Sequence, residues 1–168
     1  MAHQAALELD AAGTAWILTA TALVLLMTIP GLALFYGGMV RRKNVIGTVA
    51  QAFAVTCVVT IVWMAVGYGL AFGVNPDETM NRYIGSFGPM FLNGVTIETA
   101  YAAAPGLPEF LWIVFQMTFA IITPALIAGA FAERMKFSAL LIFTALWSVL
   151  VYSPICHWVW GGGFLGGD

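Results

Sequence analysis

Four long stretches without a charged side chain dominate this sequence. The stretches lie between Asp10 and Arg41, Lys43 and Asp77, Glu109 and Glu133, and Lys136 and Asp168. A helix needs about 20 apolar residues to cross roughly 30 Å of hydrocarbon, and each stretch is long enough. We therefore expect an all-α, polytopic integral membrane protein with transmembrane helices at about 14–39, 45–72, 110–132 and 137–160.

The composition excludes the soluble alternatives. Of the 168 residues 61% are hydrophobic and only 8% are charged, whereas an average soluble domain carries about a quarter charged residues. Six Lys/Arg and eight Asp/Glu are too few to cover the surface of a soluble enzyme of this size. A nucleic-acid-binding protein would need a basic stripe, which a net charge of −2 does not provide.

The positions of Lys and Arg predict the orientation. Five of the six basic residues follow the first or third expected helix: Arg41, Arg42, Lys43, Arg134 and Lys136. The positive-inside rule therefore places loops 40–44 and 133–136 in the cytoplasm. The loop 73–108 and the N-terminus are then outside, and residues 1–10 form a short tail. We expect residues 1–168 to be part of one transmembrane domain in the plasma (inner) membrane.

Few polar side chains fall within the expected helices, which contain no Asp, Glu, Lys or Arg. Gln116 is either a hydrogen-bond partner between helices or part of a solute path. It shares a helix face with Phe119, three residues later. Trp160 is either an interfacial anchor or a ring that faces solute. If Phe119 and Trp160 share a vestibule, their rings hold a small cation by cation–π attraction of about 0.5–2 kcal/mol.

The remaining reactive side chains do not suggest catalysis. His157 is either a structural histidine at a helix end or a proton relay. Cys57 and Cys156 differ in expected height by roughly 10 Å, too far for a disulfide, and we expect both to be buried small side chains. No His or carboxylate lies at ligand spacing from them, so we expect no metal and no cofactor. Without a nucleophile–base pair, an intramembrane enzyme is the least favoured class.

Three groups of residues resemble the ammonium transporter (Amt) family. The first is TALVLLMTIPG at 21–31, followed by LFYGG at 34–38 and KNV at 43–45. The second is FQMTFA at 115–120, followed by GAFAER at 129–134 and FS at 137–138. The third is HWVWGGG at 157–163. Because these long strings occur in order through all four expected helices, the resemblance covers nearly the whole chain.

The resemblance implies an eleven-helix transporter, normally a homotrimer with one pore per subunit. Its substrate is ammonium/ammonia, with methylammonium as an analogue. On the matching positions, Phe119 looks like the phenyl of the gate and Trp160 like the aromatic wall of the recruitment site. Gln116 looks like their polar neighbour. The family's pair of pore histidines is missing from the matched positions, so the chain looks like the N-terminal portion of an incomplete eleven-helix fold.

Three functions follow from this resemblance, and the first is favoured. The chain is a part of a transmembrane ammonium transporter or channel, with the lipid bilayer as its surroundings. Alternatively, it is an ammonium-sensing membrane protein of the same fold. The third reading is a structural membrane fragment that does not conduct.

Overall fold

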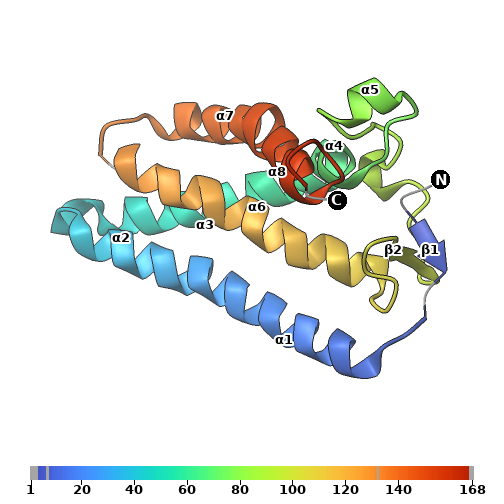
Figure 1. The fold of residues 1–168 in the computed structure, drawn as a ribbon. Helices are drawn as coiled ribbons and strands as arrows, with labels where there is room; N and C mark the ends of the chain where they lie inside the picture. Colours follow the sequence, from blue (N-terminus) through green and yellow to red (C-terminus); the bar gives the residue numbers. More distant parts are fainter. Residues whose placement is uncertain (1–3, 7, 132, 167–168) are drawn as a thin grey trace.

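The computed structural model describes residues 4–6, 8–131 and 133–166. Four long helical segments lie side by side in an elongated bundle (Figure 1). Each is long and apolar enough to cross a membrane: Ala11–Met39, Arg42–Phe72, Glu109–Phe131 and Phe137–Trp160. The expected polytopic helical fold is therefore confirmed. The expected end of the third helix at residue 132 lies outside the described residues.

Three of the four segments change helical geometry along their length. The first comprises α1 (Ala11–Leu26), a π-helical turn (Met27–Leu32) and α2 (Ala33–Met39). The second comprises a 3₁₀ turn (Arg42–Asn44), α3 (Val45–Val62), a π-helical turn (Trp63–Gly67) and α4 (Tyr68–Phe72). The fourth comprises α7 (Phe137–Trp147), a π-helical turn (Ser148–Tyr152) and α8 (Ser153–Trp160).

Local chemistry explains several of these boundaries. The side chain of Asp10 accepts a hydrogen bond of 3.0 Å from the amide of Ala12 and so caps α1. Pro30 lacks an N–H, and Ile29 before it leaves the helical conformation. Pro154 falls in the first turn of α8, where a missing N–H is tolerated. The third segment, α6 (Glu109–Phe131), continues through Pro124.

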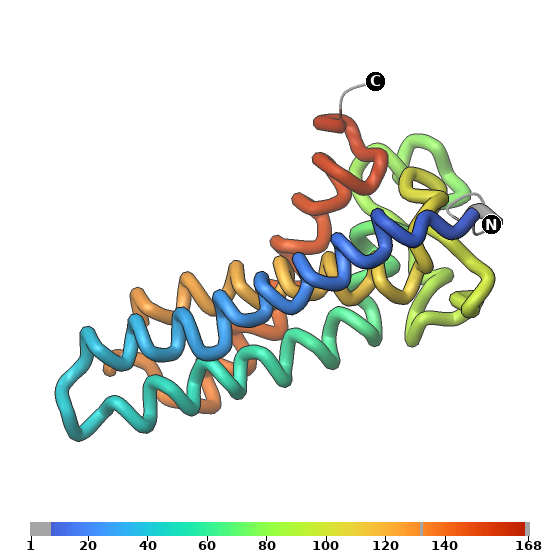
Figure 2. The backbone as a smooth tube through the Cα atoms, turned by 90° about the horizontal axis from the view of Figure 1, so that it is seen from below, coloured from blue at the N-terminus to red at the C-terminus, as the bar shows by residue number. Residues whose placement is uncertain are grey.

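The fourth segment bends between α7 and α8. In the view of Figure 2, α8 leaves the direction of α7 and turns toward the end of the bundle that carries residues 73–108. We call this the loop end. The opposite end, where α2 meets α3 and α6 meets α7, is the hairpin end. The bend follows the π-helical turn Ser148–Tyr152, a common cause of kinks in long helices.

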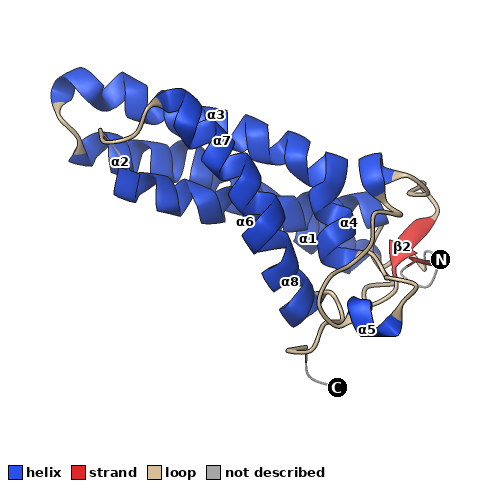
Figure 3. Ribbon diagram, turned by 90° about the horizontal axis from the view of Figure 1, so that it is seen from above, coloured by secondary structure: helices blue, strands red, loops and turns tan. Residues whose placement is uncertain are grey.

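The loop end is more ordered than the hydropathy pattern indicates. It contains α5 (Glu78–Asn81), a 3₁₀ turn (Met90–Leu92) and strand β2 (Thr99–Tyr101) (Figure 3). Strand β1 (Gln4–Ala6) pairs with β2 in antiparallel register, with Gln4 opposite Tyr101. The expectation that residues 1–10 are only a short tail was therefore wrong for 4–6. A strand of three residues is too short to show a hydropathy period. It is stabilised by pairing with β2, which lies far away in the sequence.

An aromatic cluster fills the core of the loop end. Trp63, Tyr68 and Phe72 from the second segment pack edge-on or tilted at centroid distances of 5.8–6.2 Å. Phe72 also meets Tyr101 of β2 and Trp112 of α6, and these two rings stack at 5.2 Å. The cluster thus joins the second segment, the third segment and the loop. Cys156 is buried beside it, whereas Cys57 is exposed, so the expected burial of Cys57 was wrong.

Candidate functional site: an aromatic cavity beside α6

A cavity of about 330 Å³ lies between α6 and the fourth segment, where it is lined by residues just before α8 and at the end of α8. Its lining residues are Phe115, Gln116, Phe119, Thr123, Tyr152 and Trp160. The α6 residues recur every three or four positions, which places them on one helix face. Tyr152 ends the π-helical turn just before α8 and Trp160 ends α8, so the cavity extends along α8. All three residues singled out in the sequence, Gln116, Phe119 and Trp160, line it.

The rings of the cavity are accessible. The side chain of Phe119 is 38% exposed and that of Trp160 is 63% exposed. Phe119 packs edge-on against Phe115 at a centroid distance of 5.1 Å, which steadies its ring. Below it, the hydroxyl of Thr123 donates a 2.7 Å hydrogen bond to the carbonyl of Phe119. The cavity therefore presents aromatic surface together with one amide side chain.

Sequence reasoning did not assign three of the lining residues to the site: Phe115, Thr123 and Tyr152. The i, i+4 spacing from Phe119 was a signal for Thr123. Tyr152 gave no such signal, because its place depends on the bend before α8. Its ring rests on the buried ring of Trp63 at 6.2 Å.

A buried carboxylate lies at the loop end of α6. The helix begins at Glu109, whose side chain is fully buried and accepts a 2.9 Å hydrogen bond from the hydroxyl of Tyr68. The expected helix began at residue 110, with Glu109 as the charged boundary of the stretch, whereas in the structure Glu109 is the first residue of the helix and is buried. Tyr68 offers the donor that a buried carboxylate requires, and so joins the second segment to the third.

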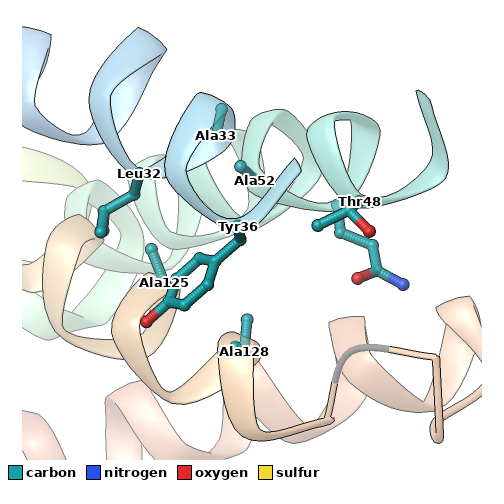
Figure 4. A pocket seen from close by; sticks show the side chains of 9 residues that line it. Leu32, Ala33, Tyr36, Thr48, Ala52, Ala125 and Ala128 are labelled. Atoms are coloured by element: carbon teal, nitrogen blue, oxygen red, sulfur yellow. The ribbon is translucent and has the colours of Figure 1, made fainter. Parts of the chain in front are cut away.

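A second, much smaller cavity shows how tightly the first three segments pack. Tyr36 of α2 reaches across to α6 between Ala125 and Ala128 (Figure 4), and its hydroxyl donates a 3.0 Å hydrogen bond to the carbonyl of Leu126. The volume left here is about 10 Å³, at the lower limit for one water molecule. A methyl group at Gly129 would overlap the Tyr36 ring. Tyr36 therefore packs tightly against α6, and the remaining space is too small for a solute.

Glu133 joins the two short loops of the hairpin end. One oxygen of its carboxylate accepts hydrogen bonds from the side-chain amide of Asn44 at 2.6 Å and from the backbone amide of Arg41 at 3.1 Å. These bonds favour the ionised form. The pKa of the Glu133 carboxyl is therefore below its usual range. The hydrogen bond from Asn44 contributes most to this shift, and the bond from the Arg41 amide contributes next.

This bridge predicts a specific sensitivity to acid. Because the folded-state pKa of Glu133 is depressed, its contribution to stability is present above the unfolded pKa of about 4.3 and is lost as pH falls through the folded value. We expect Glu133→Gln to flatten the fall in melting temperature as the pH is lowered below the unfolded pKa. Glu98→Gln, at an exposed loop carboxylate, is the control. Thermal unfolding in detergent over a pH series measures the effect, and identical acid profiles for both variants would contradict it.

The fold and the cavity define a class: a polytopic helical membrane protein with an aromatic cavity beside one transmembrane helix. The family model described as Ammonium Transporter Family matches residues 15–167. The chain therefore belongs to the ammonium transporter family. It is 46% identical to an ammonium transporter of Aquifex aeolicus over 99% of this chain and 38% of that protein. It is 50% identical to an ammonium transporter of Bacillus subtilis over 86% of this chain and 34% of that protein.

Solved structures agree with this assignment. Mep2 of Candida albicans matches 94% of this chain and 33% of its own chain, with a TM-score of 0.81 and 32% identity. A structure titled Sensor Amt Protein matches 92% of this chain and 35% of its own, with a TM-score of 0.75 and 27% identity. The chain spans roughly a third of the length of the relatives that it matches.

Proposed function

We propose that this protein takes part in transmembrane transport of ammonium/ammonia and that the aromatic cavity recruits the cation. One observation carries the proposal: Gln116, Phe119 and Trp160, drawn from two separate helices, line the same cavity in a member of the ammonium transporter family. The proposed substrate-binding residues are these three, and methylammonium is the expected analogue.

The chemistry of the cavity suits a small monovalent cation. Each aromatic face attracts a cation by about 0.5–2 kcal/mol. Because no carboxylate among the described residues lines the cavity, the bound cation can leave it again and move further into the protein. The cation then meets a largely apolar interior, where an ion is costly and neutral ammonia is not. Ammonium bound at the cavity is therefore expected to lose a proton before it moves further into the protein as ammonia. The family's pore histidines lie outside the positions matched in this chain. We therefore assign recruitment and entry of the cation to residues 1–168.

Phe119 is the proposed gate. Its ring is braced by Phe115 on one side and stands partly exposed in the cavity. A phenyl group in that place admits a cation that sheds its water and obstructs one that keeps it. Gate and recruitment site are then neighbours, because both are built on the Gln116–Phe119 face of α6.

The proposed membrane arrangement follows from the charges at the two ends of the bundle. We infer that loops 40–44 and 133–136 are cytoplasmic and that the loop end, with the N-terminus, is outside the plasma (inner) membrane. The cavity then opens toward the outside. Exposed apolar side chains such as Leu18, Leu26 and Ile61 suit contact with lipid or with further membrane segments. A homotrimer is the proposed assembly.

A sensing role is the second candidate, since a structure titled Sensor Amt Protein shares this fold. A sensor binds ammonium at the same cavity without sustained uptake. A structural fragment shows neither binding nor uptake. Uptake and ammonium-binding measurements on the protein expressed at its full encoded length together separate all three.

The experiment is uptake into proteoliposomes that contain the full-length protein. We expect saturable, ammonium-inhibited uptake of methylammonium and little uptake of potassium. Phe119→Ala removes the gate ring and is expected to lower the preference for ammonium over potassium by about twofold to thirtyfold, equivalent to about 0.5–2 kcal/mol. Phe110→Ala is the control, because Phe110 is on the same helix and is 40% exposed but does not line the cavity. Absence of uptake would refute transport, and equal selectivity in both variants would refute the gate.

A further inference from the structure

Three consecutive backbone carbonyls at the loop end are bound by the end of the fourth segment. The carbonyl of Asn81 lies 2.6 Å from Nε2 of His157, and that of Tyr83 accepts a 2.6 Å hydrogen bond from the indole N–H of Trp158. Between them, the carbonyl of Arg82 accepts a 3.1 Å bond from the amide of Phe164. We call these three contacts the clamp. The clamp therefore holds residues 81–83 against α8 and the residues that follow it.

His157 also reaches a second partner. Its Nδ1 lies 2.9 Å from the carbonyl of Ala71, near the end of α4, and the side chain is fully buried. Gly161 approaches the same Ala71 carbonyl so closely that a methyl group there would overlap it. One imidazole thus connects α4, the end of α5 and α8. Both of its nitrogens face backbone oxygens, so the side chain faces neither solvent nor the aromatic cavity.

The position of Trp160 depends on α8. This helix has only eight residues, follows a π-helical turn and leaves the direction of α7. The place of its last residue therefore depends on how α8 packs against its neighbours beyond the bend, in particular against α4. His157 lies one turn before Trp160 on the same helix. His157 contacts Ala71 of α4 and Asn81 of α5, so it joins α8 to both elements one turn before the residue that lines the cavity.

We propose that His157 is a positioning residue for cation recruitment: it anchors α8 to Ala71 and Asn81, and thereby holds Trp160 at the aromatic cavity. This inference rests on the proposed function. It makes His157 important for affinity although the side chain does not line the cavity. The imidazole has nitrogens on opposite sides of a flat ring, so it lies between two carbonyls from different segments. In its neutral form its single N–H donates to one of these carbonyls, and the other nitrogen packs against the second.

A double-mutant cycle tests whether His157 acts through Trp160. The measured quantity is the KM for methylammonium uptake by the full-length protein in proteoliposomes, together with Vmax per folded protein. We expect His157→Ala to raise KM about fivefold to tenfold with Vmax within about twofold, since a shifted ring loses its contact with the cation. In a Trp160→Leu background the same change should raise KM by less than about twofold, because residues that act as a unit are not additive.

Two further variants keep the test decisive if His157→Ala does not fold. His157→Gln keeps an amide N–H that donates to one carbonyl, and we expect an intermediate KM. Trp158→Phe keeps an aromatic ring beside Phe164 but removes the indole donor to Tyr83, and it should raise KM in the same direction. Melting temperature and size-exclusion profiles show which variants are folded.

The outcomes separate this inference from the proposed function. If the unaltered protein takes up no ammonium, both are overturned. If uptake occurs and Trp160→Leu raises KM, but folded His157 variants keep the normal KM, the positioning role alone is overturned. Full multiplication of the two effects in the double variant also overturns it, because His157 would then act independently of Trp160.

Discussion

Replacing Gly161 with alanine is expected to prevent α8 from docking and to leave little folded protein. A methyl group at this position would overlap the carbonyl oxygen of Ala71 and lie 2.6 Å from Nδ1 of His157. The first obstacle is backbone within α4, which no side-chain rotation relieves. Overpacking a rigid site costs about 1–3 kcal/mol, and we expect the upper end or more because the whole of α8 must move.

Two glycines provide matched controls for this change. Gly38 of α2 and Gly47 of α3 have no atom within 4 Å of an added methyl group. Alanine at either site should be tolerated and should favour the helix by up to about 1 kcal/mol. The measurement is the yield of monodisperse protein and its melting temperature in detergent. A Gly161→Ala variant as stable as the two controls would show that α8 does not approach Ala71 so closely.

The second large effect is expected from Trp160→Leu. Leucine retains apolar bulk at the end of α8 but lacks the aromatic face that attracts a cation. Loss of one cation–π contact of about 0.5–2 kcal/mol corresponds to a KM about twofold to thirtyfold higher, and we expect about tenfold in this partly desolvated cavity. Vmax should change less than KM, because the ring takes part in binding the cation before it moves on.

Trp16→Leu is the control for this substitution. Trp16 is 72% exposed on α1 and does not line the cavity, so its loss tests the general effect of removing an exposed indole. Methylammonium uptake over a range of concentrations gives KM for both variants. An unchanged concentration dependence in Trp160→Leu, or an equal change in Trp16→Leu, would remove the indole of residue 160 from the recruitment site.

These predictions connect binding with architecture. Trp160 contributes the ring, His157 is proposed to hold the helix that carries it, and Gly161 allows that helix to approach α4. The three residues lie within five positions. This short segment therefore includes one ring that lines the cavity and two residues that contact α4. Under the proposed function, we expect changes at the loop end to affect entry of the substrate as well as folding.

The sequence alone determined the number and approximate places of the membrane segments. Hydropathy is a property of each stretch by itself, because the cost of placing a chain in hydrocarbon does not depend on the other segments. It also determined the family, through long strings such as residues 115–120 and 157–163. The assignment of Gln116, Phe119 and Trp160 to recruitment came from the same strings and stays a prediction.

Only the tertiary structure decided how distant residues meet. It placed Trp160 and Tyr152 beside Phe119, buried Glu109 under Tyr68, and paired residues 4–6 with β2. Each of these depends on which face of one helix packs on another and on where α8 bends. Such choices are made by contacts between segments far apart in the chain, and no local pattern of hydropathy or charge records them.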